Sequence, residues 1–301
     1  MKFYICTTFL ILSTVHTSLW SQISKELIGF EYSVTPDIGE ISIEKYQIST
    51  NLGKKTSKGM IGFGISYTFH NYNYNNANIN LDPWTYKTIH SIKSTISYRH
   101  YFNKSWMGNL VFSPVLSSNF ESEISHEDIF LNAYFTISKR WKKKNEYSIF
   151  TMGIGYGTLL GKQQFIPIIN YENVINKQWS YKLGFPKTRL QYLVNNRNKL
   201  SATLEFDGLF ANNSSTVAFP ETKYLTDTKI QYNNLNLGIY NEYKIQPNWV
   251  TTFHLGYTLW NQLKILDQDF NEIHNFETNG SVFINMGLKF NLKNKNNEHK
   301  K

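Results

Sequence analysis

From about residue 25 onward, apolar residues recur at every second position, and no stretch of comparable length shows a helical period. The segment 280–292 shows this most clearly. Its even-numbered positions from 282 onward are all apolar, namely Val282, Ile284, Met286, Leu288, Phe290 and Leu292, and its odd-numbered positions are mostly small or polar. Successive side chains on a strand point to opposite faces, so this alternation predicts β-strands. The pattern recurs in 59–70, 146–158, 199–210 and 249–260, and we therefore expect an all-β protein.

The alternation and the turn residues together predict about fourteen strands. Their ranges are 26–34, 40–52, 59–70, 87–102, 105–116, 127–140, 146–158, 165–172, 178–185, 187–194, 199–210, 229–245, 249–260 and 280–292. Between 165 and 194 the strands are short and contain Pro167 and Pro186, which we expect at strand ends or bulges. Merging strands there gives an alternative of twelve. A parity shift between Ile43 and Tyr46 predicts a bulge near Glu44 and Lys45.

The connections alternate between very short polar turns and others, several of them long. The long ones include 71–85, 117–127, 211–228 and 261–279. Bacterial outer-membrane barrels alternate in this way, and strands of roughly 9–15 residues suit a tilted membrane crossing better than a sandwich. We therefore predict a transmembrane antiparallel up-and-down β-barrel, with its apolar face toward lipid. A soluble secreted β-sandwich, with the apolar face inward, is the alternative.

Tryptophan gives an independent indication of a membrane. Trp106, Trp141, Trp179 and Trp249 each lie within a residue or two of a short turn. If all short turns lie at one end of the barrel, these four side chains share one level. Such a level is typical of the aromatic girdle at a membrane interface.

The N-terminal residues 1–21 have the features of a secretory signal peptide. Lys2 is followed by an apolar stretch, 3–15, and small residues then precede Gln22. A single membrane anchor is less favoured because the apolar run is short. We expect the barrel to occupy 22–292 and a polar tail 293–301. The one cysteine, Cys6, lies inside the signal peptide, whose removal with Lys2 changes the formal charge from +9 to +8.

Composition narrows the location and the partners. Hydrophobic residues make up 41% of the chain, charged residues 18%, and the mean hydropathy is −0.40. A polytopic helical membrane protein is excluded, because it needs repeated runs of about 20 apolar residues. The basic turn residues, such as Lys54 and Lys55, suit anionic lipid headgroups, and we expect no nucleic-acid partner. The expected location is the bacterial outer membrane, reached through the secretory pathway, with outer-membrane lipid as partner.

The chain resembles an uncharacterised family of outer-membrane β-barrels from Gram-negative bacteria, a family built on a domain of unknown function. The residues that carry the resemblance are Gly153-Ile-Gly-Tyr-Gly157, Phe165-Ile-Pro-Ile-Ile-Asn-Tyr171, Trp179, Phe185-Pro186 and Leu190-Gln-Tyr192. The resemblance implies fold and location, and it carries over no catalytic residues. The tail after Leu292 departs from the many barrels that end on an aromatic residue, for which Phe290 can substitute.

The sequence offers little support for catalysis, a metal or a cofactor. The run Gly153, Gly155 and Gly157 is not followed by a helix, so we expect lumen-facing glycines and not a phosphate cradle. A Ser–His hydrolase is conceivable with His100 and Ser113, but the parity of His100 places it toward lipid. His70, His90 and His126 are expected at strand ends or in loops. We therefore expect no enzyme activity, no metal site and no cofactor.

Charged residues on the polar parity are the candidate functional residues. They are Glu31, Lys93, Arg99, Lys187, Arg189, Glu205, Asp207, His254 and Lys289, with Arg189 one hairpin away from Glu205 and Asp207. One hypothesis is a charged constriction in a passive pore for small solutes. The other is a set of internal ion pairs in a plugged, structural or surface-binding barrel. The long loops 71–85, 211–228 and 261–279 offer room for a surface ligand.

Overall fold

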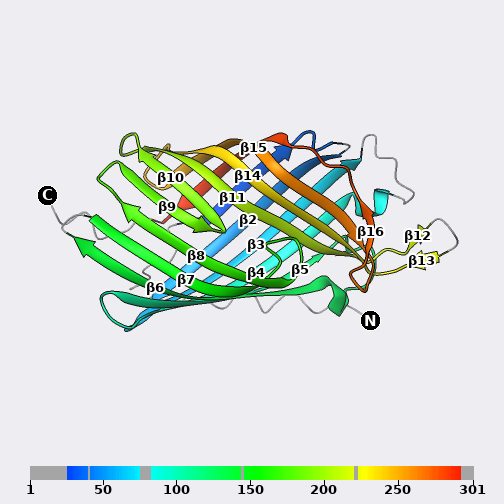
Figure 1. Cartoon of the computed structure of the whole chain (residues 1–301), viewed down its shortest axis with the longest axis horizontal. Helices are drawn as coiled ribbons and strands as arrows, with labels where there is room; N and C mark the ends of the chain where they lie inside the picture. The colour runs from blue at the N-terminus through cyan, green and yellow to red at the C-terminus, as the bar shows by residue number, and fades with distance from the viewer. Residues whose placement is uncertain (1–25, 40, 75–82, 144–145, 220–222, 293–301) are drawn as a thin grey trace, which may run out of the picture.

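A closed β-barrel is the whole architecture of the computed structural model, which describes residues 26–292 apart from 40, 75–82, 144–145 and 220–222 (Figure 1). The predicted signal peptide, residues 1–21, and the tail, 293–301, lie outside this range. Fourteen antiparallel strands form the wall. They are β1 (Glu26–Thr35), β2 (Ile41–Lys55), β3 (Gly59–Tyr74), β4 (Thr88–Tyr101), β5 (Trp106–Ser118), β6 (Ile129–Lys143), β7 (Glu146–Gly157), β8 (Gln164–Val174), β9 (Trp179–Phe185), β10 (Lys187–Leu193), β11 (Asn198–Asn213), β14 (Thr228–Lys244), β15 (Trp249–Leu266) and β17 (Ser281–Asn291).

The barrel closes between its first and last strands. Each strand pairs with its neighbour along the chain, and β1 pairs with β17 from Glu26↔Asn291 to Val34↔Ile284. Closure leaves no pair of open edges at the ends of the sheet, as a structure in lipid requires. The predicted fourteen-stranded up-and-down barrel is therefore confirmed, and the alternative of twelve strands is wrong.

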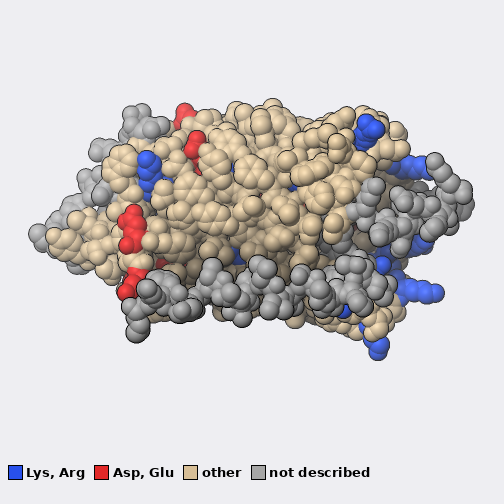
Figure 2. Space-filling model, turned by 180° about the vertical axis from the view of Figure 1, so that it is seen from behind, with Lys and Arg blue, Asp and Glu red and all other residues tan. Residues whose placement is uncertain are grey.

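The two faces of the wall distinguish a membrane barrel from a soluble sandwich. Large apolar side chains stand exposed on the outside of nearly every strand, for example Phe30, Ile96, Leu110 and Leu255. Figure 2 shows that most charged residues of one side gather at the two ends, with an almost uncharged surface between them. A belt of this extent would aggregate in water but matches the lipid-facing band of a barrel. Among the described residues, no helix has the length and apolar character needed to cross a membrane.

Connections at one end of the barrel are short, and those at the other are mostly longer. The short-turn end holds the connections 56–58, 102–105, 175–178, 194–197 and 245–248. The long-loop end holds two short 3₁₀ turns, η1 (Pro83–Tyr86) and η2 (His126–Asp128), a small hairpin of β12 (Val217–Phe219) with β13 (Lys223–Leu225), and β16 (Glu272–Asn275), which pairs with β15. The predicted alternation of loop lengths is thus present, with the exception described next.

The exception is the connection between β9 and β10, which is the single residue Pro186. Both strands have seven residues and end near the middle of the barrel, while β8 and β11 continue toward the long-loop end (Figure 1). Pro186 therefore lies at a strand end, as predicted. Pro167 does not, because it lies inside β8. It pairs with Ile154 of β7 on one side, and it has no strand on the other, where proline is tolerated.

The predicted bulge near Glu44 and Lys45 is wrong. The ladders of β2 with β1 and β3 run through both residues without a register shift. Ile41 and Ile43 instead continue on the inner face with Lys45 and are buried. The parity shift therefore records a change in the interior, which becomes apolar toward the long-loop end.

The glycine run of β7 leaves space for a neighbouring side chain. A Cβ placed on Gly155 would collide with the ring of Tyr134, and one on Gly157 would meet the Asn132 amide. Tyr134 and Asn132 lie on β6, which pairs with β7. The run therefore fits packing inside a wall, and no helix follows it that would form a phosphate cradle.

The orientation of the wall gives a direct test. Ile96 of β4 is 54% exposed on the outer face, and the adjacent Ser97 faces inward. We expect Ile96→Lys to destabilise the folded barrel by about 2–4 kcal/mol, because a lysine would enter the lipid-facing band. Ser97→Lys, the matched control, is expected to be tolerated. The measurement is the temperature at which the folded band is lost on a detergent gel; equal loss for both variants would contradict this assignment of faces.

Candidate functional site

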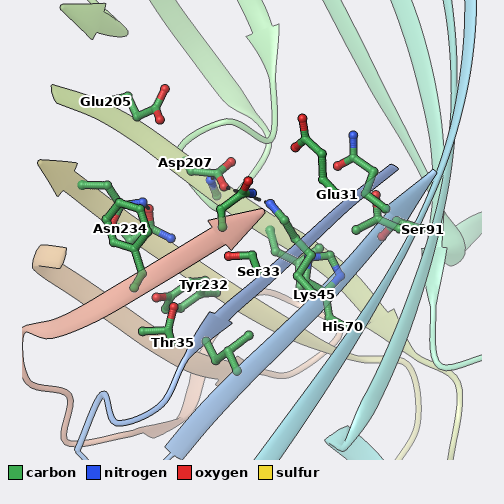
Figure 3. Close-up of a pocket in the computed structure, with 18 of the residues that line it drawn as sticks. Glu31, Ser33, Thr35, Lys45, His70, Ser91, Glu205, Asp207, Tyr232 and Asn234 are labelled. Carbon is green, nitrogen blue, oxygen red and sulfur yellow. Dashed lines mark hydrogen bonds and ion pairs between the residues drawn. The ribbon is translucent and has the colours of Figure 1, made fainter. Parts of the chain in front are cut away.

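A polar chamber of about 530 Å³ occupies the middle of the barrel (Figure 3). Its lining side chains come from β1–β6, β10, β11, β14, β15 and β17, so it lies within the lumen. A second cavity of about 290 Å³ shares Glu31, Gln47 and Lys93 with it, and extends along the wall to Glu26, Asn51 and Thr95. The interior therefore continues from the chamber toward the short-turn end.

Lys289 is the centre of one charge cluster in the chamber. Its ammonium lies 3.0 Å from a carboxylate oxygen of Glu31 and 3.2 Å from one of Glu26. The strand closure positions these residues, because Lys289 of β17 pairs with Gly29 of β1. One cation thus serves two carboxylates at the join between the first and last strands.

A second cluster joins β2 to β10 and β11, which are not its neighbours in the wall. Lys187 forms an ion pair with Glu205, its cross-strand neighbour, and Lys45 lies 3.7 Å from Asp207 (Figure 3). Arg189 lies one hairpin away from Glu205 and Asp207, because β10 and β11 are consecutive paired strands. Arg189 pairs with Thr203 and Lys182 two residues closer to the short-turn end, and it does not line the chamber.

Three other residues that the sequence predicts in the lumen, Lys93, His254 and Arg99, lie at different places. Lys93 lines both cavities, and no ion pair to it is found among the described residues. His254 lines the chamber, where its Nε2 lies 3.1 Å from the Thr203 hydroxyl and its ring contacts Phe283. Arg99 lies near the start of the β4–β5 turn, outside both cavities.

Toward the long-loop end the lumen is filled by apolar side chains, here named the plug. Its buried residues are Ile38, Ile41, Ile43, Tyr72, Tyr86, Ile89, Ala211, Val217, Ile230, Tyr232, Leu263, Ile265 and Phe276. The plug draws on both the strands and the connections, including Tyr86 of η1 and Phe276 beyond β16. It lies directly beyond the chamber, since Ile43, Tyr72 and Tyr232 line both.

A buried polar network adjoins the plug. Lys229 of β14 is 1% exposed, and its ammonium donates to Glu127 Oε2 at 2.6 Å and to Asn212 Oδ1 at 2.8 Å. Asn212 in turn donates to Asp128 at 2.8 Å. Nearby, Asn119 donates to Asn213 at 2.6 Å. These contacts tie the β5–β6 connection to the upper ends of β11 and β14.

Sequence reasoning missed several chamber residues. Lys45 was assigned to a bulge, although its parity matches Gln47 and Ser49 on the polar face of β2. His70 was expected at a strand end, but it lies within β3, lines the chamber and stacks against Tyr72 at 6.4 Å. Unbroken alternation in both strands was the signal that would have found them.

The structure does not bring together the Ser–His pair that was considered for hydrolysis. His100 lies on the outer face, with its Nδ1 3.0 Å from the Tyr98 hydroxyl. Ser113 is buried and donates to Thr95 at 3.0 Å. The four tryptophans considered as a girdle, Trp106, Trp141, Trp179 and Trp249, all lie exposed next to the short-turn end. Lys139 lies between two of them, 5.3 Å from the Trp106 ring and 5.2 Å from that of Trp141.

The buried ion pair of Lys229 gives a prediction on stability. Glu127→Gln leaves a buried ammonium without its carboxylate, so we expect a loss of about 2 kcal/mol at neutral pH. Lys229, through its hydrogen bond, lowers the pKa of the Glu127 carboxyl. The stabilisation is therefore present above the pKa of Glu127 in the unfolded chain and disappears as the pH falls through its lowered folded value.

The measurement is the urea midpoint of the barrel in detergent micelles, taken at neutral and at acid pH. The difference between wild type and Glu127→Gln should shrink at acid pH. Glu123→Gln, at an exposed position on the same connection, is the matched control and should behave as wild type at both. A difference independent of pH would contradict the ion pair as its source.

Comparison with known proteins gives similar solved structures and a family. No curated protein matches the chain. Among solved structures, the COG4313 outer membrane channel from Pseudomonas putida F1 is 7% identical with a TM-score of 0.47, covering 93% of this chain and 100% of that chain. The translocator domain of autotransporter NalP from Neisseria meningitidis is 10% identical with a TM-score of 0.43, covering 90% of each chain. The KdgM porin is 10% identical with a TM-score of 0.38, covering 88% of this chain and 99% of that chain.

A family profile matches residues 39–291, which is nearly the whole described barrel. The resemblance to an uncharacterised outer-membrane barrel family is thereby confirmed. The chain belongs to the family described as Domain of unknown function (DUF6268).

Proposed function

We propose that this protein is a passive conduit for small solutes whose chamber is closed along the barrel axis by the plug. One observation carries the proposal: a cavity of about 530 Å³, lined mainly by polar and charged side chains, ends at a cluster of buried apolar ones. A purely structural barrel has no need of such a chamber, and an open pore has no need of the plug. The geometry thus favours a gated conduit over both an open pore and a filled barrel.

The chamber has free hydrogen-bonding capacity as well as charge. Among the described residues, the Tyr72 hydroxyl and His70 Nδ1 are buried and have no protein hydrogen-bond partner. Lys93 adds a cation with no ion pair in that part of the chain. Buried polar groups are costly when unsatisfied, and a small shift of the neighbouring side chains would let water or a solute in the chamber pair with them. We expect the solute to be small and polar at the part that reaches these groups.

We further propose that the barrel resides in the bacterial outer membrane after export through the secretory pathway. The apolar belt and the four tryptophans support contact with its lipid, and the girdle role of those tryptophans is part of this proposal. Lysines at the short-turn end, such as Lys54 and Lys55, suit anionic headgroups on that side. We propose no enzymatic activity and no nucleic-acid partner.

Planar-bilayer conductance tests the closed axis. Wild type should give little steady conductance, because the plug fills the lumen at the long-loop end. Tyr86→Ala removes a fully buried ring from the plug and should produce open-channel steps. Trp84→Ala, an exposed ring on the same 3₁₀ turn, is the matched control and should resemble wild type. Large steady steps in wild type would overturn the proposal.

Charge reversal in the chamber gives a second test, made on the open Tyr86→Ala background. Lys93→Glu replaces a cavity cation without breaking an ion pair of the described residues, so the reversal potential in a salt gradient should move toward cation preference. Lys54→Glu, outside both cavities, should move it less. Equal shifts from the two variants would show that current does not pass through the chamber.

A further inference from the structure

The wall of the barrel is interrupted between β8 and β11. Strands β9 and β10 fill only the part near the short-turn end, where β8 pairs with β9 from Ile169 to Val174 and β10 pairs with β11 up to Glu205. Beyond them, β8 residues 164–168 pair only with β7. On the β11 side of the break, the last hydrogen bond to the short strands is donated by the Phe206 amide to the Pro186 carbonyl, at 3.2 Å.

Beyond this point β11 leaves the wall and turns inward. Its Asn212 forms a parallel bridge with Ser118 of β5, a strand from the other side of the break. Phe210 packs its ring against Phe130 of β6 at 5.1 Å, and Val115 of β5 packs against the same cluster, so the outer face of β11 lies against the inner face of β5 and β6. The two edges at the break therefore overlap as layers and do not meet in a ladder.

The chamber extends through this overlap. Asp207 and Leu209 from one face of β11 line it, and so do Gly208 and Phe210 from the other face. The chamber also reaches Asn132 and Thr158, which belong to the overlapping wall and to its connection.

The connection between β7 and β8, residues 158–163, lies over the break. A Cβ on Gly208 would meet the Leu159 carbonyl oxygen at 2.5 Å and the Gly161 nitrogen at 2.7 Å, so backbone packs directly on backbone here. Gly161 has a φ of +72°, which favours glycine. The Thr158 amide donates to Asn132 Oδ1 at 2.8 Å, which fastens one end of the connection to β6. This connection covers the passage without being part of any ladder.

The break lies at the depth of the lipid. Trp179 begins β9 directly after the short turn 175–178, and Trp106 and Trp249 likewise begin β5 and β15 directly after short turns. Seven residues rise about 23 Å along a strand and about 18 Å along the axis at a tilt of about 40°. The apolar band of such a barrel is about 25 Å tall, so the strands end inside it. The rim is aromatic: Phe165 is 72% exposed, and Phe185 and Phe206 contact each other at 5.3 Å.

We infer that the break between β8 and β11 is a lateral passage through which a single-tailed amphiphile enters the chamber from the membrane. The aromatic rim suits the tail, which remains at lipid depth. The chamber directly behind it carries the Lys187–Glu205 and Lys45–Asp207 pairs, which suit a small zwitterionic head. The inference rests on the proposed conduit and names its route and substrate class: the plug closes the axis, and the wall supplies the opening.

Photo-crosslinking tests the passage. The probe is a dodecyl phosphocholine with a diazirine on the chain next to the head, added to phosphatidylcholine vesicles that hold the full barrel. Labelled residues are located by mass spectrometry. We expect labelling at Phe165 and Phe206 of the rim and at Glu205 and Asp207 of the chamber, severalfold above that of outward residues on the continuous wall of β2–β4. Labelling confined to the outer belt would overturn the inference.

Two matched variants distinguish entry through the break between β8 and β11 from entry at the short-turn end. Thr158→Trp fills the chamber at the break, whereas Gln47→Trp fills it where the chamber joins the lower cavity. We expect Thr158→Trp to reduce labelling of Glu205 and Asp207 severalfold and Gln47→Trp to leave it unchanged. The reverse result means that the amphiphile arrives from the short-turn end: the lateral passage then fails while the proposed conduit stands. An open wild-type conductance overturns the plug-closed axis, and with it the proposed function on which the inference rests.

Folding of each variant is checked by its heat-dependent shift on a detergent gel. Thr158→Leu, a smaller substitution, is the second variant if the tryptophan prevents folding. It should reduce chamber labelling in the same direction, and unchanged labelling with a folded Thr158→Leu and a folded Thr158→Trp contradicts the passage.

Discussion

Backbone hydrogen bonding in lipid is the constraint on which this structure depends. A strand that crosses a bilayer has no water to satisfy its N–H and C=O groups, so each strand needs a partner on both sides. The closure of β1 with β17 meets that need for the sheet as a whole. It also fixes the faces of every strand, because a slip of one residue would exchange the lipid face and the lumen face. The chamber, the belt and the plug all follow from that single register.

Within this constraint, the short strands β9 and β10 are an exception that the fold accommodates locally. Pro167 leaves one amide fewer to satisfy on β8, and the upper part of β11 finds its partners in β14 and at Ser118 of β5. The polar side chains Lys229 and Gln231 on the outer face of β14 are buried, and Lys229 is paired with Glu127 of the β5–β6 connection. The wall thus opens without leaving a polar strand exposed to hydrocarbon.

Most strands of the wall could be predicted from the sequence, but only part of the arrangement of side chains in the lumen. Strand positions could be predicted because alternation and turn residues act locally, and thirteen of the fourteen predicted ranges end within four residues of the observed bounds at both ends. The partner of Glu205 is Lys187, and this pairing depends on register, which the one-residue connection at Pro186 sets. The buried Ile41 and Ile43 broke the rule of polar lumen faces because segments far apart in the chain form the plug. No local sequence pattern predicts such a cluster. The inward turn of β11 is likewise not predictable from the pattern of its own residues.

The composition of the plug has a consequence for the order of assembly. Ile38 and Ile41 come from the beginning of the chain and Leu263 and Phe276 from near its end, and the Asn279 amide donates to the Ile38 carbonyl at 3.0 Å across the join. These groups meet only once the first and last strands have come together. The groups from the two ends of the chain therefore complete the apolar cluster only in the closed barrel. A barrel whose axis is blocked by the complete plug is therefore one in which the first and last strands have paired.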